Sequence, residues 1–149
     1  WVPLVLERLA FSTDSLSLLL VNLLHNLADS EANRLRLLTS GTLVALTRLV
    51  RAPSAPAALK ERSVEAAASV AGCPEEEVSF PQILGRLCGS RMPGTQLEAL
   101  RSLELLSEAQ QLRGHLRQVP DVVSGLGSAM GSLNRAVATK AVELMKVLT

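Results

Sequence analysis

The sequence has almost no aromatic residues: they make up 2% of its 149 residues, with one Trp, two Phe and no Tyr. β-Strands are usually rich in aromatic and β-branched side chains, whereas Leu and Ala lose little or no rotamer freedom in a helix. Leucine alone supplies 30 residues, so we expect an all-α fold. The scarcity of rings also removes the stacking platforms used to bind single-stranded nucleic acid.

An excess of charge of one sign is also lacking. The 15 Lys and Arg residues nearly balance the 14 Asp and Glu residues, which leaves a formal net charge of +1. No strong field therefore attracts nucleic acid or an anionic membrane. The longest uncharged run, residues 15–28, contains Asn22, His25 and Asn26 and is shorter than the roughly 20 residues of a membrane span. We expect no nucleic-acid or membrane partner, and a location in the cytoplasm and/or nucleus.

Metal-ligating and redox patterns are missing too. Cys73 and Cys88 are the only cysteines, and we interpret them as buried reduced thiols of an intracellular protein, with a single disulfide between them as the alternative. His25 and His115 lie far apart, whereas zinc ligands occur at short, regular spacings. The sequence therefore predicts no metal and no cofactor.

Patterns of catalysis are absent as well. The sequence has no nucleophile elbow and no phosphate-binding loop. Gly125, Gly127 and Gly131 superficially resemble a nucleotide-binding turn, but the third glycine is one residue late for that fingerprint. We interpret these glycines as places of close helix approach or of a helix break before Ser132. The chain is not expected to be an enzyme.

One apolar motif recurs along the chain. It begins at Leu6, Leu46, Leu84 and, in a weaker form, Val123, which are 40, 38 and 39 residues apart. Pro3, Pro81 and Pro120 each stand shortly before a copy, and proline is well tolerated in the first turn of a helix. A self-similar period of this size is typical of stacked helical repeats.

Each motif is followed by a longer amphipathic helix. We expect these helices at residues 14–28, 59–71, 95–109 and 132–148, with Asp14 and Ser132 as N-caps and Gly72 as a C-cap. Shorter helices are expected at residues 30–40 and 108–118, with a poorly formed counterpart at residues 75–79, and residues 51–57 should form a loop. The leucine stripe of the first long helix should be core. Its members are Leu16, Leu19, Leu20, Leu23, Leu24 and Leu27.

The best-defined stretch resembles an armadillo repeat. Residues 22–28 read Asn-Leu-Leu-His-Asn-Leu-Ala, residues 31–34 read Glu-Ala-Asn-Arg, and residues 40–46 read Ser-Gly-Thr-Leu-Val-Ala-Leu. They are similar to the family's third helix, to the short first helix of the next repeat, and to a glycine followed by the second helix. The motif match covers about residues 16–50, and the period covers the whole chain. HEAT-like repeats remain an alternative for the C-terminal half.

The resemblance implies a right-handed α-solenoid of about three and a half three-helix repeats, at about residues 1–28, 29–72, 73–108 and 109–149. They would form a single armadillo-type domain, as part of a longer solenoid that this chain enters in the second helix of a repeat. Third helices of such a solenoid line a concave groove. In peptide-binding members of the family, an Asn near the end of the third helix binds a peptide backbone and a Trp one turn earlier packs on its side chains.

Asn26 occupies the position of the family's Asn, and Asn22 occupies that of the Trp. Both positions lack the family's residues in the later repeats, which disfavours a generic receptor for extended peptides. The aligned pairs there are Glu65 and Ser69, Arg101 and Leu105, and Val142 and Lys146.

The resulting hypothesis is a non-catalytic adaptor or scaffold that docks a segment of another protein along the groove. The predicted partner-binding residues are Asn22, Asn26, Glu65, Ser69 and Arg101. Two alternatives stay open. One is a structural spacer or oligomerisation segment within a larger scaffold. The other is an accessory domain flanking an enzyme.

Overall fold

The computed structural model describes residues 2–10, 14–73 and 78–149. Over these residues it is 81% helical, with ten helices and no strands, so the expected all-α fold is confirmed. The short helix expected at residues 75–79 lies mostly outside the described residues. The helices are α1 (Val2–Ala10), α2 (Asp14–Leu27), α3 (Glu31–Leu38), α4 (Thr42–Arg51), α5 (Ala57–Ala71), α6 (Phe80–Cys88), α7 (Pro93–Ser107), α8 (Gln110–Gln118), α9 (Pro120–Met130) and α10 (Arg135–Leu148).

Most helix ends follow the expected local signals. Helix α5 ends at Gly72, whose φ of 81° is a left-handed conformation that glycine adopts at little cost. Helix α6 begins with a capping box. The Gln82 backbone N–H donates to Ser79 Oγ at 3.3 Å, and the Ser79 backbone N–H donates to Gln82 Oε1 at 2.8 Å. Pro81 and Pro120 lie in the first turns of their helices, as predicted.

The start of α10 differs from the expectation. Ser132 is not its N-cap; that residue is Asn134, whose Oδ1 accepts the Val137 backbone N–H at 3.2 Å. Ser132 Oγ instead accepts the backbone N–H of Asn134 at 3.1 Å. Ser and Asn are about equally good caps, so composition alone does not choose between two candidates two residues apart. Asp14 is the first residue of α2 itself.

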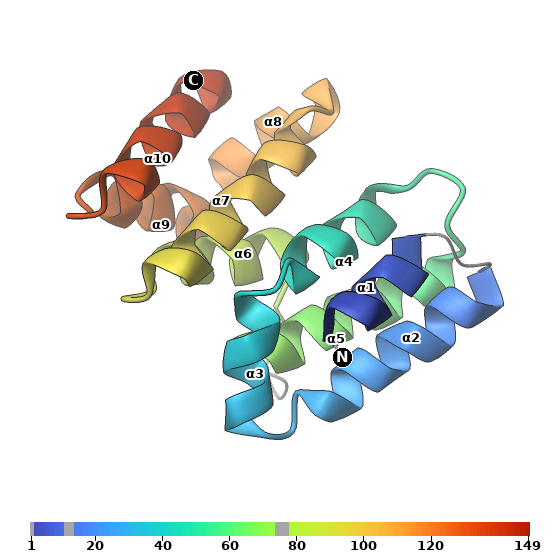
Figure 1. The fold of residues 1–149 in the computed structure, drawn as a ribbon. Helices are drawn as coiled ribbons and strands as arrows, with labels where there is room; N and C mark the ends of the chain where they lie inside the picture. Colours follow the sequence, from blue (N-terminus) through green and yellow to red (C-terminus); the bar gives the residue numbers. More distant parts are fainter. Residues whose placement is uncertain (1, 11–13, 74–77) are drawn as a thin grey trace. The chain divides into compact units, whose positions relative to one another are not determined.

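The helices group into two compact units, Trp1–Glu77 with α1–α5 and Val78–Thr149 with α6–α10. In the first unit α2 and α4 both pack on α5, α1 contacts α2 and α4, and α3 contacts α4 and α5. In the second unit α7 and α9 both pack on α10, α6 contacts α7 and α9, and α8 contacts α7, α9 and α10. Apart from the contact between α7 and α8, the two units thus have the same helix neighbours in the same chain order, and the two longest helices of each unit are in contact, α2 with α5 and α7 with α10 (Figure 1).

A second feature shared by the two units is an arginine side chain that donates to carbonyl oxygens at the end of a long helix. Arg34 Nη1 donates to the carbonyl oxygens of Ala28 at 3.0 Å and Asp29 at 3.3 Å, just after α2. In the second unit, Arg113 Nε donates to the carbonyl oxygen of Ser107 at 2.6 Å, at the end of α7. Both contacts supply donors to terminal carbonyls that lack a partner inside the helix. Each arginine comes from the short helix that follows.

The buried side of α2 is not the expected one. Its fully buried apolar residues are Val21 and Leu24. Leu16, Leu19 and Leu23 are exposed at 42%, 65% and 41%, so the predicted leucine core is wrong at these three positions. Leu20 and Leu27 are half-buried. Helix α2 is apolar on nearly every side, so the spacing of its leucines does not reveal which side faces α1 and α5.

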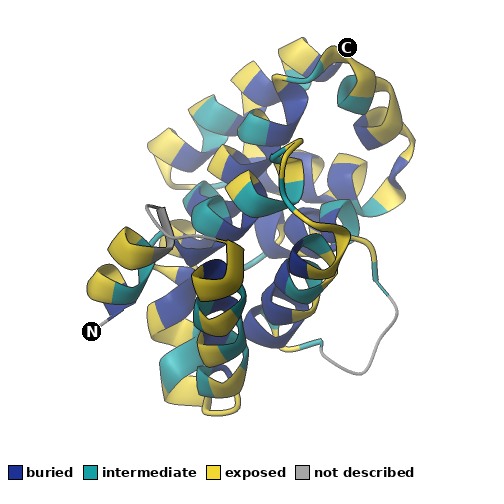
Figure 2. Cartoon of the chain, turned by 90° about the vertical axis from the view of Figure 1, so that its right-hand side faces the viewer, coloured by how far each residue is buried: buried dark blue, intermediate teal, exposed yellow. Residues whose placement is uncertain are grey.

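The core of the first unit is aliphatic, and most of its helices have one buried and one exposed side (Figure 2). Its largest fully buried side chains are Val21, Leu24, Leu37, Leu43, Leu46 and Val70.

The second unit is built around a close helix crossing. A Cβ added to Gly125 of α9 would lie 2.0 Å from the carbonyl oxygen of Gly85 in α6, which no side chain could accommodate without moving the backbone. This confirms the interpretation of Gly125 as a place of close approach. Gly131 directly follows α9 as its C-cap, so it breaks the helix before Ser132, as expected. Gly127 has no atom within 4 Å of an added Cβ.

A candidate partner-binding face between the long helices

Polar side chains connect α2 and α5 in the first unit. Arg62 Nε on α5 donates to Asn22 Oδ1 on α2 at 2.5 Å. Further along the two helices, Ser69 Oγ and His25 Nδ1 are 3.0 Å apart. We call Asn22, His25, Arg62 and Ser69 the α2–α5 bridge. It joins residues about 40 positions apart in the sequence, one repeat length.

Helical spacing explains why these residues meet. Residues three or four apart lie on one side of a helix, as Asn22 and His25 do on α2. On α5, Arg62, Glu65 and Ser69 are spaced by three and four residues. The guanidinium of Arg62 also contacts Glu65, with 2.6 Å between Nη1 and Oε2. Arg62 therefore interacts with one residue on each helix.

The bridge lies at the border between the buried contact and solvent. Ser69 is buried, Asn22 and His25 are half-buried, and the side chains of Arg62 and Glu65 are 30% and 58% exposed. An ion pair as exposed as Arg62–Glu65 contributes little to stability, on the order of a few tenths of a kcal/mol. Its groups are accordingly within reach of a partner's polar atoms.

Three of the five predicted binding residues, Asn22, Glu65 and Ser69, belong to or directly contact this bridge. Asn26 is exposed on α2, one turn after Asn22. Arg101 is exposed on α7, in the other unit, so the structure does not join it to the first four. Their role in binding stays a prediction.

The sequence-based prediction omitted His25 and Arg62. Both carry a signal that could have identified them. His25 stands three residues after Asn22, and Arg62 stands three residues before Glu65, so each shares a helix side with a predicted residue. The hydrogen bond between His25 and Ser69 fits the interpretation of His25 as a satisfied histidine rather than a metal ligand.

The second unit contains an equivalent connection. Lys140 Nζ on α10 lies 2.7 Å from Glu104 Oε2 on α7, and these side chains are 28% and 50% exposed. Arg101 precedes Glu104 by three residues, which places it on the same side of α7. The exposed sides of α7 and α10 thus carry charge of both signs.

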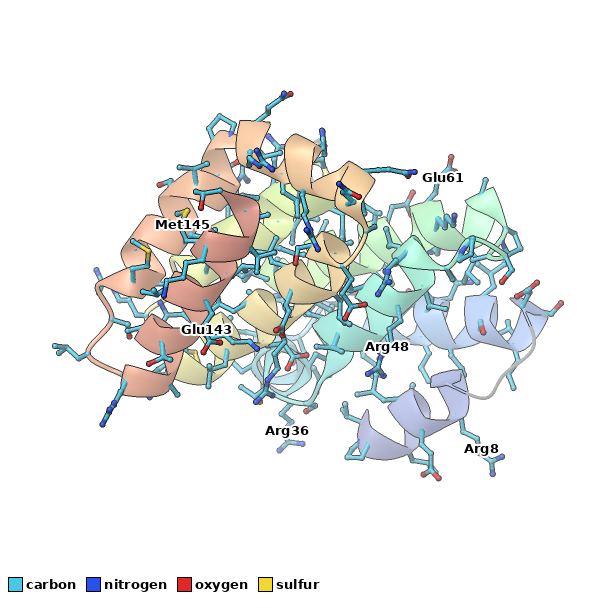
Figure 3. All side chains as sticks on the ribbon, turned by 90° about the horizontal axis from the view of Figure 1, so that it is seen from above. Arg8, Arg36, Arg48, Glu61, Glu143 and Met145 are labelled. Carbon is cyan, nitrogen blue, oxygen red and sulfur yellow. The ribbon has the colours of Figure 1, made fainter. Side chains whose placement is uncertain are left out.

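Other chemistry is scarce in the part of the chain that the structure describes. There, no group of three or more His, Cys, Asp or Glu residues could hold a metal ion. No described helix is long and apolar enough to cross a membrane. A hollow at the end of α4 is lined by Arg48, Arg51, Ala52 and Pro53, and Arg48 points outward from that helix (Figure 3).

The two cysteines differ in exposure. Cys88 is buried, as expected, and burial raises the pKa of its thiol to about 12. A thiol with this pKa stays protonated at neutral pH and is a poor nucleophile. Cys73 is half-buried, so the expectation that both cysteines are buried is wrong for Cys73.

No family model, no curated protein and no solved structure matches this chain.

Proposed function

We propose that this chain is an armadillo-type α-solenoid that docks a segment of another protein along the exposed side of its long helices. The α2–α5 bridge carries the proposal, because Asn22, Glu65 and Ser69, three of the residues selected from the sequence for peptide contact, meet there at the border between the buried contact and solvent. The shared helix neighbours of the two units and the two arginine contacts at the ends of α2 and α7 support the repeat arrangement.

The bridge offers a partner both donors and acceptors. An Asn amide can pair with the N–H and the C=O of a peptide group, and Asn26 is exposed beside Asn22. The half-buried His25 ring, whose Nδ1 pairs with the buried Ser69 hydroxyl, adds its second ring nitrogen. Glu65 and Arg62 present opposite charges at the same side of α5. Such a surface suits an extended or helical segment with mixed polar character, bound without a metal or cofactor.

The scarcity of aromatic rings affects how tightly a partner is held. Hot spots of protein interfaces are enriched in Trp, Tyr and Arg. Among the residues that we predict to bind, Arg101 is the one of these types, and Arg62 supplies a second guanidinium. We therefore expect polar recognition of moderate affinity rather than deep insertion of an anchor.

The test selects peptides from a displayed random library with the full chain as bait and measures their affinity by fluorescence anisotropy. We expect the double variant Asn26→Ala/Glu65→Ala to weaken the selected peptides at least tenfold, because both side chains are exposed on the proposed face. Arg36→Ala, an exposed change on α3, is the matched control and should bind like the wild type. Peptides that bind equally well to the double variant would contradict the proposed site.

A further inference from the structure

The hollow at the end of α4 brings two guanidinium groups together. Its volume is about 240 Å³, and its lining residues, which we call the α4 hollow, are Arg48, Arg51, Ala52 and Pro53. Arg48 and Arg51 are both exposed. Because they are three residues apart, they lie on one side of α4. The hollow therefore presents two positive charges to the solvent at one place.

The chemistry of this hollow fits a phosphate group. Carbonyl oxygens at the C-terminal end of a helix carry partial negative charge, so only the two guanidinium groups attract an anion there. No acidic residue stands between Glu31 and Glu61 in the sequence, so neither α4 nor the loop after it supplies a competing carboxylate. A phosphate monoester carries a charge of about −1.5 to −2 at neutral pH and has three acceptor oxygens. Guanidinium groups pair with such oxygens two at a time.

A serine stands directly beside the hollow. Residues 52–55 form a turn in which the Ala55 backbone N–H donates to the carbonyl oxygen of Ala52 at 3.3 Å. Pro53 is the second residue of this turn, a position that proline favours, and Ser54 is the third. Ser54 is exposed, and it directly follows Pro53, which lines the hollow. The chain itself would therefore hold a phosphate on the Ser54 hydroxyl close to the two arginines.

This attachment distinguishes a phosphate on Ser54 from a phosphate ion in solution. Exposed ion pairs are individually weak, so two of them do not offset the translational freedom that a free ion loses on binding. A phosphate bonded to Ser54 has already lost that freedom. Its effective concentration at the hollow is about millimolar, as for other short tethers. The hollow is therefore suited to a phosphate carried by the adjacent loop.

Arg51 also provides a recognition signal for a protein kinase. Kinases discriminate between substrates by charge pattern, and one group of them selects an arginine three residues before the serine, as Arg51 stands before Ser54. Arg36 stands in the same relation to Thr39. The Thr39 hydroxyl, however, donates to the carbonyl oxygens of residues 35 and 36 at 3.1 and 3.3 Å, at the end of α3. Ser54 lies in a loop between two helices instead, so it is the more accessible of the two sites.

We propose that Ser54 is a phosphorylation site and that Arg48 and Arg51 hold its phosphate in the α4 hollow. The phosphate donor is ATP, and the catalyst is a protein kinase that selects arginine before serine. Ser54 Oγ bonds to the γ-phosphorus of ATP while the bond from that phosphorus to the β–γ bridging oxygen breaks, and ADP leaves. The hydroxyl proton passes to the catalytic base of the kinase. None of the residues proposed for peptide docking takes part.

The first test treats the full chain with ATP and a kinase of this specificity, and mass spectrometry locates the phosphate. We expect Ser54 to be modified at least tenfold faster than Thr39. Ser54→Ala should remove this modification, whereas Thr39→Ala is the matched control and should be modified like the wild type. Modification of Thr39 in place of Ser54, or of neither residue, would contradict the assigned site.

The second test measures whether the two arginines hold the phosphate. Phosphoserine is incorporated at position 54 of the full chain by genetic-code expansion, and phosphorus NMR follows the titration of its phosphate. Because nearby positive charge favours the dianion, the pKa of the phosphate should lie about 0.5 or more below that of a free phosphopeptide of residues 52–57. Arg48→Gln and Arg51→Gln should each raise this pKa toward the value of the peptide.

Arg36→Gln is the matched control of the second test, since Arg36 is exposed on α3 and does not line the hollow; it should leave the pKa of the phosphate unchanged. Circular dichroism verifies that each variant is folded. A phosphate pKa equal to that of the peptide would overturn the proposed contact with the arginines. The same conclusion would follow if neither Arg48→Gln nor Arg51→Gln changed the pKa.

Discussion

At the scale of single residues, glycine has opposite roles within one helix. Gly125 lets α9 approach the backbone of α6, whereas Gly127, two residues later, faces open space. The sequence predicted that glycines of this segment allow close approach, but it could not tell which of them do so. The distinction depends on the neighbour that α9 packs against, and that neighbour lies about 40 residues earlier in the chain.

We expect Gly125→Ala to destabilise the protein by about 2 kcal/mol or more, because the new methyl group would overlap the Gly85 carbonyl and force α6 and α9 apart. Gly127→Ala is the matched control. It adds a methyl group into open space and replaces a poor helix former, so it should be neutral or stabilising by about 0.5–1 kcal/mol. Urea unfolding followed by circular dichroism measures the free energy of unfolding of both variants. Equal effects of the two substitutions would contradict a close contact between α6 and α9 at Gly125.

Burial likewise separates the two thiols. We expect iodoacetamide at pH 8 to alkylate Cys73 well before Cys88 in the folded protein, because the pKa of Cys88 is raised to about 12 by burial and alkylation requires the thiolate. Both should react at similar rates in concentrated urea. Mass spectrometry of Cys73→Ala and Cys88→Ala assigns the two rates. Fast modification of Cys88 without urea would show that this part of α6 opens readily.

At the scale of helices, the residues at which a helix begins and ends were more predictable than the side of the helix that is buried. Gly72, Pro81 and Pro120 determine ends through backbone geometry, which a local sequence encodes. The error at Ser132 arose because Ser132 and Asn134, two residues apart, are caps of similar strength. The error at Leu16, Leu19 and Leu23 has a different cause: α2 is apolar nearly all round, and only its contacts with α1 and α5 decide which side is buried.

Two arginines donate to carbonyl oxygens at the ends of α2 and α7, and we expect them to stabilise these helix ends. Arg34→Ala and Arg113→Ala should each destabilise the protein by about 1 kcal/mol, because each leaves terminal carbonyls without a charged donor. Arg36→Ala and Arg117→Ala, both exposed changes on the same two short helices, are the controls and should have effects below about 0.5 kcal/mol. Thermal unfolding measures the four variants. An effect at only one of the two positions would show that this stabilising arginine contact is not shared by both units.

At the scale of the whole molecule, the all-α class was predictable from composition, whereas the predicted repeat count stays a prediction. The two five-helix units repeat at 79 residues, from Asp14 of α2 to Pro93 of α7, which is about twice the predicted spacing. The candidate site was predictable in part, since Asn22, Glu65 and Ser69 follow from aligning the long helices. Helical spacing indicates the helix side on which Arg62 and His25 lie, but that they meet Asn22 and Ser69 depends on how α2 and α5 are placed side by side.

The division of the chain into two compact units predicts that the second unit, residues 78–149, folds by itself. Residues 78–149 contain five helices, and their core includes the fully buried Ile83 and Leu84 of α6 together with Val122 and Leu126 of α9. We expect this segment to be helical and to melt cooperatively by circular dichroism. Residues 89–149, which lack α6, should lose the cooperative transition, because removing α6 exposes the apolar side of α9 that packs at Gly85. If residues 78–149 are unfolded while the full chain is stable, the two units depend on each other for folding.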